Sequence, residues 1–246
     1  MVKDTILNTY IFTCTQKISK CVYTVRPTRL SSLNIFVVRN EVDPNCAYHC
    51  DAVSAVLSTA EEIDFAGGDR ISLDAADGVV LTGSTAGVYE SDSHEWITEQ
   101  AQLVRDLIDR EIPTLGICFG HQLVHSALGG TVEHVGMTAG LVEATMVDDP
   151  LFEGVGPVVV SLHGDVVTEP ADELEVIASA PHAQVFATRH RNAPLWTVQF
   201  HPEITAGHRE RLVDDFGWQE AEFSFADVTA GRIFQNFVRI VDERTG

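Results

Sequence analysis

The fold of this chain is decided by Leu115-Gly116-Ile117-Cys118-Phe119-Gly120-His121-Gln122-Leu123, which is typical of a buried strand that turns directly into a helix. Glycines stand two residues before and two residues after Cys118, where they remove Cβ atoms that would clash in a tight turn. Such a turn presents the side chain at its apex. A helix over about 120–128 would place its free N–H groups and its dipole beside the sulfur, which favours the thiolate. We therefore predict that Cys118 is a nucleophile and that the N–H of Phe119 faces an oxyanion.

A second stretch supplies a base for this nucleophile. The apolar segment Trp196-Thr197-Val198-Gln199-Phe200 leads into His201-Pro202-Glu203. The proline favours an extended conformation at His201, and residues i and i+2 of an extended chain face the same side. The Glu203 carboxylate would then orient the imidazole. A glycine-flanked cysteine also occurs where the side chain merely packs, but a thiolate, a base and an anion together are what nucleophilic amide chemistry requires.

These two motifs, Gly116–Leu123 followed by Gln199–Glu203, resemble the class I glutamine amidotransferase family with its Cys-His-Glu triad. The resemblance covers roughly residues 33–203. It implies that the side-chain amide of glutamine is attacked, that ammonia leaves, and that water hydrolyses a γ-glutamyl thioester on the cysteine. The catalytic residues would be Cys118, His201 and Glu203.

The same resemblance implies four substrate-binding positions, which are Gly83, Phe119, Gln122 and Gly164. Gly83 would supply the second oxyanion donor, although Thr82 and Ser84 flank it here and the proline of the common family form is missing. A plain turn between strand and helix is the alternative there. His163 is an alternative base to His201, but only His201 is followed by Pro-Glu.

The order of the expected elements predicts the fold class. Strands over 33–38, 62–65, 77–84 and 115–117 alternate with helices over about 46–60 and 94–111, and further strands are expected over 131–135, 140–147 and 158–165. We expect an α/β, flavodoxin-like, doubly wound and mostly parallel sheet with helices on both faces. Active sites of such folds lie at the carboxyl ends of strands, where Gly83, Cys118 and His201 fall.

The composition indicates one folded acidic protein. Of 246 residues 45% are hydrophobic, and 36 acids against 16 bases give a formal net charge of −20. All three lysines lie within the first twenty residues. Such a surface repels nucleic acid and anionic membranes, and it suits a salt-rich cytoplasm, where salt screens the self-repulsion. An ordinary acidic enzyme is the alternative to this halophilic interpretation.

The chain divides into two unequal parts. Residues 1–32 are basic and rich in Ser and Thr, and we predict a non-catalytic extension, with a targeting peptide or partner-binding arm as the alternatives. Residues 33–246 would form the amidotransferase domain with C-terminal helices, since Ile233, Phe234 and Phe237 lie on one helical face. No uninterrupted apolar span has the length of a signal peptide or transmembrane helix.

The five cysteines show no disulfide framework and fit a reducing, cytoplasmic compartment. Cys46, His49 and Cys50 could suggest metal ligands, but a structural zinc site normally brings paired ligands from two places, and this spacing also fits one face of a helix. His121 and His125 are interpreted as structural. We predict no metal and no cofactor.

The ammonia acceptor lies outside the sequence. Ala66-Gly67-Gly68-Asp69 lacks the ending that a phosphate-binding loop needs, so a synthetase that uses ATP would be another chain. The expected protein is a stand-alone domain similar to the amidotransferase part of GMP synthase. A γ-glutamyl peptidase with the same triad and a silent regulatory binding module are the alternatives.

Overall fold

The computed structural model of the protein describes residues 33–245. Five parallel strands form one part of its sheet. The prediction for residues 1–32 lies outside the described residues. The parallel strands are β2 (Glu61–Asp64), β1 (Ile35–Arg39), β3 (Gly78–Leu81), β4 (Thr114–Ile117) and β10 (Leu195–Val198), in this spatial order. Helices alternate with these strands along the chain, so the predicted α/β fold class is confirmed.

An antiparallel region extends this sheet beyond β10. β9 (Ala183–His190) pairs with β10, and β7 (Val158–Glu169) and β5 (Thr131–Glu143) follow it. β8 (Leu174–Ala180) pairs with β9 and with β6 (Thr145–Met146). The prediction of separate strands over 131–135 and 140–147 was wrong. One strand runs through both, because the pairing of β5 with β7 shifts register between His134 and Thr138 and then continues.

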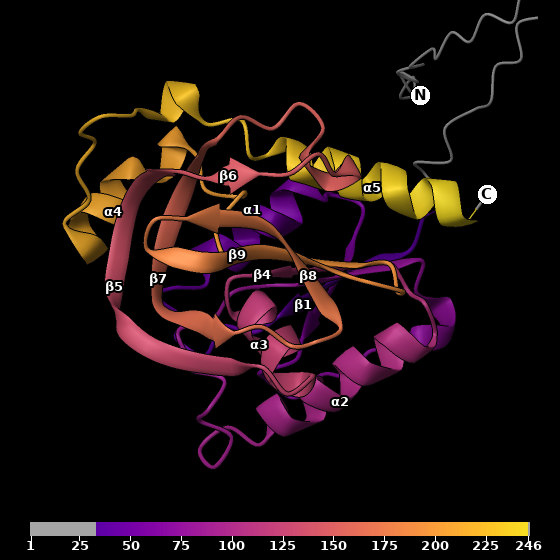
Figure 1. The fold of residues 1–246 in the computed structure, drawn as a ribbon. Helices are drawn as coiled ribbons and strands as arrows, with labels where there is room; N and C mark the ends of the chain where they lie inside the picture. Colours follow the sequence, from indigo (N-terminus) through magenta and orange to yellow (C-terminus); the bar gives the residue numbers. More distant parts are fainter. Residues whose placement is uncertain (1–32, 246) are drawn as a thin grey trace, which may run out of the picture.

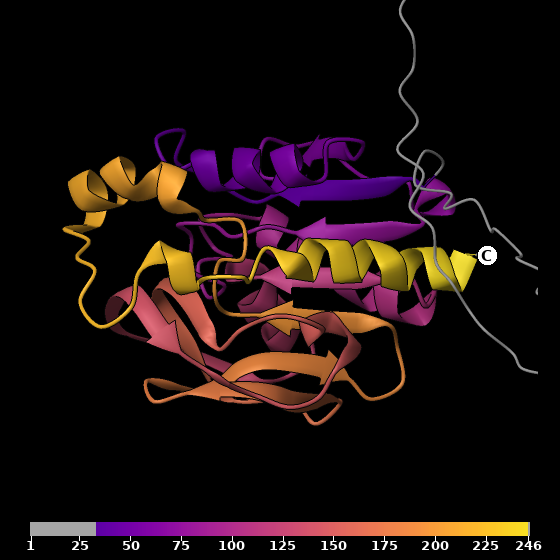
Figure 2. The ribbon, with the colours of Figure 1, turned by 90° about the horizontal axis from the view of Figure 1, so that it is seen from above.

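Helices cover both faces of the sheet, as Figure 1 shows for α5 on one side and α2 on the other. α1 (Tyr48–Val56) and α5 (Arg232–Thr245) bury their apolar faces in one core cluster, and α2 (Trp96–Asp109) and α3 (Phe119–Ala127) in a second. In Figure 2, α5 crosses in front of the strands. The strands alternate between the two clusters, so that Val80 faces the first while its neighbours Val79 and Leu81 face the second.

A smaller cap lies at the carboxyl ends of the strands. α4 (Arg209–Phe216) ends at Gly217, whose φ of 63° is the left-handed conformation of a helix C-terminus. Leu212 and Trp218 pack with Ile204 against Val160 of β7. Four short 3₁₀ helices complete the described chain: Leu73–Ala75, Pro150–Phe152, Ala206–His208 and Phe225–Asp227. The cap places the segment after β10 directly against β7.

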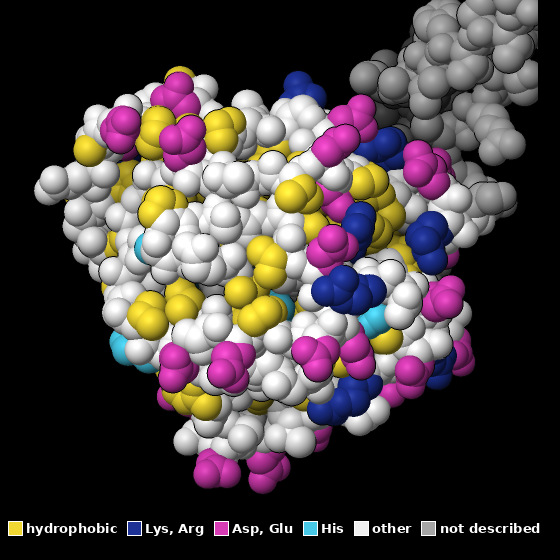
Figure 3. Space-filling view, in the orientation of Figure 1, with side chains coloured by type: hydrophobic (Ala, Val, Ile, Leu, Met, Phe, Trp, Pro, Cys, Tyr) yellow, Lys and Arg dark blue, Asp and Glu magenta, His cyan; other side chains and the backbone are white. Residues whose placement is uncertain are grey.

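The surface carries the acidity seen in the composition. On the face shown in Figure 3, acidic side chains are scattered among arginines and hydrophobic patches, and no broad basic area is visible on that face. Within residues 33–245, no helix combines the length and hydropathy that crossing a membrane requires.

Candidate active site

Cys118 stands at a strained turn between β4 and α3. Its φ of 51° and ψ of −103° lie outside the regions that ordinary residues favour, and Glu111 is the only other non-glycine residue with positive φ in the described chain. A Cβ at Gly116 would lie 2.8 Å from the carbonyl oxygen of Gly120, and one at Gly120 would lie 2.5 Å from that of Leu81. The two glycines therefore permit the tight turn, as the sequence indicates.

His201 and Glu203 follow β10 and form a buried pair. The Nδ1 atom of His201 lies 2.6 Å from Oε1 of Glu203, whose side chain is fully buried. The Nε2 atom lies 3.0 Å from the carbonyl oxygen of Leu162, and Sγ of Cys118 lies 3.9 Å from the same oxygen. The sulfur, the imidazole and the carboxylate thus meet where β4, β7 and β10 come together.

The surroundings of His201 hold it in the protonated form. Burial disfavours its charge, but the negative charges of Glu203 and Cys118 outweigh this and raise the pKa of His201 well above its usual value. Both ring nitrogens face acceptors, the Glu203 carboxylate and the Leu162 carbonyl, so each can donate a proton. The raised pKa of His201 therefore favours an imidazolium beside the sulfur.

Two backbone N–H groups near the sulfur are free to bind an oxyanion. Among the described residues, neither Gly83 nor Phe119 uses its N–H in a hydrogen bond. Phe119 is the first residue of α3, where no partner exists within the helix. Its side chain instead packs against Trp96 with ring centroids 5.4 Å apart. A Cβ at Gly83 would lie 3.5 Å from Cε1 of His201, which places this glycine beside that ring.

Gln122 is already engaged within the protein. Its Nε2 atom donates to the carbonyl oxygen of Asp165 at 3.1 Å and to Oε1 of Gln199 at 3.2 Å. Gln199 in turn donates through Nε2 to Sγ of Cys118 at 3.6 Å. Sequence reasoning missed Gln199, although it precedes His201 by two residues and the period of an extended chain would have indicated the same side.

Gly164 precedes Asp165, whose carboxylate is largely buried. A Cβ at Gly164 would lie 3.0 Å from Cε1 of His134. The Asp165 carboxylate accepts a hydrogen bond from the hydroxyl of Tyr89 at 3.2 Å and pairs with Nδ1 of His134 at 2.7 Å. The segment after β3 is thereby joined to β5 and β7 across the rim.

His163 lacks the partner that a catalytic base needs. Its Nδ1 atom donates to the carbonyl oxygen of Asp165, and its Nε2 atom lies 3.2 Å from Nε2 of His182. Burial lowers the pKa of His163 to about 4, so the ring is neutral. No carboxylate orients this ring among its described partners, which favours His201 as the base.

His121 and His125 lie within the core, away from the sulfur. They bond the hydroxyl groups of Thr197 and Thr188, respectively, and these two hydroxyl groups bond each other. Burial lowers the pKa of His125 to about 4, so it stays neutral. The arrangement agrees with a structural role for both.

A second buried ion pair lies beside the site and was missed in the sequence. His49, considered there only as a metal ligand, bonds Glu41 with Nε2 and Oε2 2.8 Å apart. Sγ of Cys50 lies 3.7 Å from Nδ1 of the same ring. Within the described residues, no group of three or more His, Cys, Asp or Glu is arranged to hold a metal ion. Glu41 lies in the loop before the helix, eight residues from His49, and no helical or strand period connects the two in the sequence.

Comparisons with known proteins agree with this geometry. Residues 45–219 match the family described as "Glutamine amidotransferase class-I". The "GMP synthase [glutamine-hydrolyzing]" of Mycolicibacterium paratuberculosis is 35% identical over 173 residues, which are 67% of this chain and 31% of that protein. A protein of Methanothermobacter thermautotrophicus, named as one subunit of a glutamine-hydrolyzing GMP synthase, is 40% identical over 106 residues, 40% of this chain and 57% of that protein. The chain thus matches only part of these relatives' length.

Solved structures share the fold. A protein from Thermoplasma acidophilum, described as a putative GMP synthase subunit, superposes with a TM-score of 0.65 at 22% identity, covering 87% of this chain and 96% of that one. A glutamine amidotransferase from Thermotoga maritima gives a TM-score of 0.64 at 19% identity, with 86% and 95% covered. At such identities the similarity concerns the fold alone.

Proposed function

The chain belongs to the class-I glutamine amidotransferase family, and we propose that it hydrolyses the side-chain amide of glutamine at Cys118 to release ammonia for a separate synthetase chain that uses ATP. The observation that carries this proposal is the meeting of Cys118 with the buried His201–Glu203 pair beside two free N–H groups. The relatives named as single subunits of GMP synthase support the division of labour between two chains.

The first half of the reaction forms a thioester. The thiolate of Cys118 attacks the side-chain carbonyl carbon of glutamine, and the oxygen becomes an oxyanion bound by the N–H groups of Gly83 and Phe119. As the C–N bond breaks, His201 gives its proton to the leaving amide nitrogen, which departs as ammonia. The Glu203 carboxylate holds the ring in orientation and stabilises its positive charge before that transfer.

The second half regenerates the enzyme. His201, now neutral, takes a proton from water as the water attacks the thioester carbonyl, and the same two N–H groups bind the new oxyanion. The carbon–sulfur bond then breaks, which releases glutamate and restores the thiolate beside the imidazolium. Both steps use only groups present in this chain, with water as the co-substrate.

The hydrogen bond between Tyr89 and Asp165 at the rim of the site favours a small substrate over a peptide. Tyr89 and Asp165 are bonded across the rim, and Cys118 keeps only 7% of its surface exposed. A free amino acid needs less opening of this contact than a γ-glutamyl peptide does. We therefore propose glutamine rather than a γ-glutamyl peptide as the substrate.

The test is the Cys118→Ala variant. Ammonia release from glutamine should fall by at least about 10⁴-fold, because no other group can form the thioester. A diazoketone analogue of glutamine should alkylate the wild-type protein at Cys118 and leave the variant unmodified. Assays are run on the chain alone and mixed with a synthetase chain of the GMP synthase type.

The matched control for Cys118→Ala is the same substitution at a second cysteine. Cys46→Ala removes a half-buried thiol outside the triad and should retain wild-type activity. Full activity of Cys118→Ala would overturn the assignment of the nucleophile. Faster turnover of γ-glutamyl peptides than of glutamine would favour the peptidase instead. Binding of glutamine without turnover in either assay would favour a regulatory module.

A further inference from the structure

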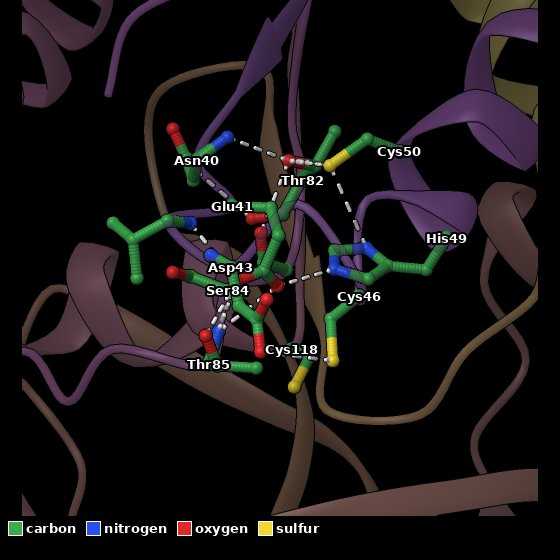
Figure 4. Close-up of polar contacts among 12 residues, drawn as sticks. Asn40, Glu41, Asp43, Cys46, His49, Cys50, Thr82, Ser84, Thr85 and Cys118 are labelled. Atoms are coloured by element: carbon green, nitrogen blue, oxygen red, sulfur yellow. Dashed lines mark hydrogen bonds and ion pairs between the residues drawn. The ribbon is translucent and has the colours of Figure 1, made fainter. Parts of the chain in front are cut away.

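The Glu41–His49 pair connects three segments that surround the active site. Glu41 follows β1, His49 lies in the first turn of α1, and Thr85 lies after β3. The Glu41 carboxylate accepts hydrogen bonds from the backbone N–H of Thr85 at 3.1 Å and from its hydroxyl, as well as from Nε2 of His49 at 2.8 Å. Figure 4 shows Glu41 between these two partners. The pair therefore restrains the segment that contains Gly83.

A second set of bonds restrains the same segment from its other side. Asn40 donates through its backbone N–H to Oγ1 of Thr82 and through Nδ2 to the carbonyl oxygen of Thr82, both at 3.0 Å. The Thr82 hydroxyl donates to the carbonyl oxygen of Gly83 at 3.1 Å. With both flanks held, the N–H of Gly83 has no partner in the described chain.

The ring of His49 lies against the catalytic histidine. The ring centroids of His49 and His201 are 6.1 Å apart, with planes inclined by 75°. A Cβ at Gly83 would lie 3.3 Å from Cε1 of His49 and 3.5 Å from Cε1 of His201. A side chain at this position would therefore meet both rings.

Stability does not explain why an ion pair occupies this place. The side chains of Glu41 and His49 are 3% and 9% exposed, and buried ion pairs are often replaced by apolar groups without loss. His49 also stands in the first turn of α1, where the helix dipole disfavours a cation. Burial opposes its charge too, but Cys50 and Glu41 outweigh this and raise the pKa of His49 to about 10. The positive charge of the ring is thus opposed by three effects, which are burial, the helix dipole and the charge of His201.

We propose that the Glu41–His49 pair is a positioning element of the hydrolytic site, which fixes the Gly83 peptide with its N–H free and holds the ring of His49 beside that of His201. The inference rests on the proposed function, because the reaction it assists is the attack of Cys118 on an amide. A positive charge at this distance stabilises the thiolate and the oxyanion, and it opposes protonation of His201.

Other titratable groups face the two rings and remain in every variant below. They are Glu203, Cys118 and His163 around His201, and Cys50 and Tyr48 around His49. Removing the charges of Glu41 and His49 should therefore shift the pH dependence of the reaction at Cys118 without abolishing it. In His49→Gln the lost charge is positive, so the pKa values of both the Cys118 thiol and His201 should move upward. The double variant removes one charge of each sign, and the shift should keep this direction but be smaller, because His49 is the member of the pair whose ring packs on His201.

The test compares His49→Gln with the double variant Glu41→Gln/His49→Gln. The double variant keeps side chains that can hydrogen-bond at both positions and leaves no unpaired buried carboxylate, so it guards against misfolding of the single variant. We expect kcat for glutamine to fall by about tenfold to fiftyfold in both, with KM within about threefold, because oxyanion stabilisation acts in the transition state.

A second measurement does not depend on the substrate. The rate of alkylation of Cys118 by iodoacetamide is followed against pH, with the modified peptide identified by mass spectrometry. Both inflection points of this profile should move to higher pH, by roughly half to one pH unit in His49→Gln and by less in the double variant. His190→Gln is the matched control, since His190 is a buried histidine paired with Glu173 at 3.4 Å and stands on β9. It should leave kcat and the profile unchanged.

The outcomes separate this inference from the proposed function. A folded double variant with wild-type kcat and an unshifted alkylation profile would overturn the positioning role. An equal loss in His190→Gln would overturn it too, because any buried histidine would then have the same effect. If the wild-type protein consumes no glutamine but the profile still shifts, the proposed substrate fails while the electrostatic role of His49 stands.

Discussion

Two groups of glutamate, histidine and cysteine meet at Gly83. In one, Glu203 holds His201 at 2.6 Å beside Cys118. In the other, Glu41 holds His49 at 2.8 Å, with Sγ of the neighbouring cysteine 3.7 Å from the ring. Both glutamates are buried and both histidines have raised pKa values. Residue type and charge alone therefore do not distinguish the two groups.

The backbone around each thiol makes the difference. Cys118 occupies a positive-φ turn at the start of α3, with a free N–H on the next residue. Cys50 lies within α1, where it is fully buried and its sulfur contacts the hydroxyl of Thr82 at 3.3 Å. A thiolate formed there would meet no oxyanion donor and no substrate. Nucleophilic chemistry needs the strained turn and the open N–H groups as much as the three side chains.

The largest expected difference between the two groups is between their glutamates. Glu203→Gln leaves the imidazolium without its counter-charge and permits the wrong tautomer, so kcat should fall by about 10³–10⁴-fold. Glu41→Gln removes a group that acts only through Gly83 and His49, and a loss of about tenfold is expected. Steady-state ammonia release measures both variants. Equal losses would mean that the two carboxylates have the same role, which would contradict the comparison.

A smaller effect is expected from Gly83→Ala, which touches both groups at once. The added Cβ would lie 3.3 Å from the ring of His49, which must move by a few tenths of an ångström, and 3.5 Å from that of His201, which is ordinary contact. We expect kcat to fall by about tenfold through misplacement of the oxyanion donor, with little change in the melting temperature.

The control for this substitution is Gly140→Ala. Gly140 lies on β5, and a Cβ there would meet no atom within 4 Å. Its kcat should match the wild type. A comparable fall in both variants would show that the loss at Gly83 reflects general perturbation of the fold rather than contact with the two rings.

The sequence predicted the parts of this site that follow from local spacing. The glycines around Cys118 indicated the turn, and the two-residue separation of His201 and Glu203 indicated their contact, because each pattern lies within a few residues. The alternation of strands and helices predicted the parallel half of the sheet for the same reason. These signals depend on the backbone period and need no knowledge of distant contacts.

The parts that sequence reasoning missed depend on distant contacts. Glu41 reaches Thr85 across 44 residues, and Gln199 reaches Cys118 across 81. The single strand β5 was divided in the prediction, because a register shift has no sequence period of its own. His49 was considered only with its helical neighbours, whereas its partner comes from the loop before the helix.

The smallest effect is expected from Cys50→Ala, and it tests whether the second thiol has any chemical role. The sulfur is buried and contacts only His49 and the Thr82 hydroxyl among its described polar partners. The hydroxyl keeps its bonds to Asn40 and to the Gly83 carbonyl after the change. Folding stability should fall by about 1 kcal/mol through the lost packing, and kcat should stay within about threefold of the wild type. Iodoacetamide should modify Cys118 in this variant at the wild-type rate. A loss as large as that of Glu203→Gln would instead assign the second thiol to the reaction, because a buried sulfur without an oxyanion site can influence turnover only through the ring that it contacts.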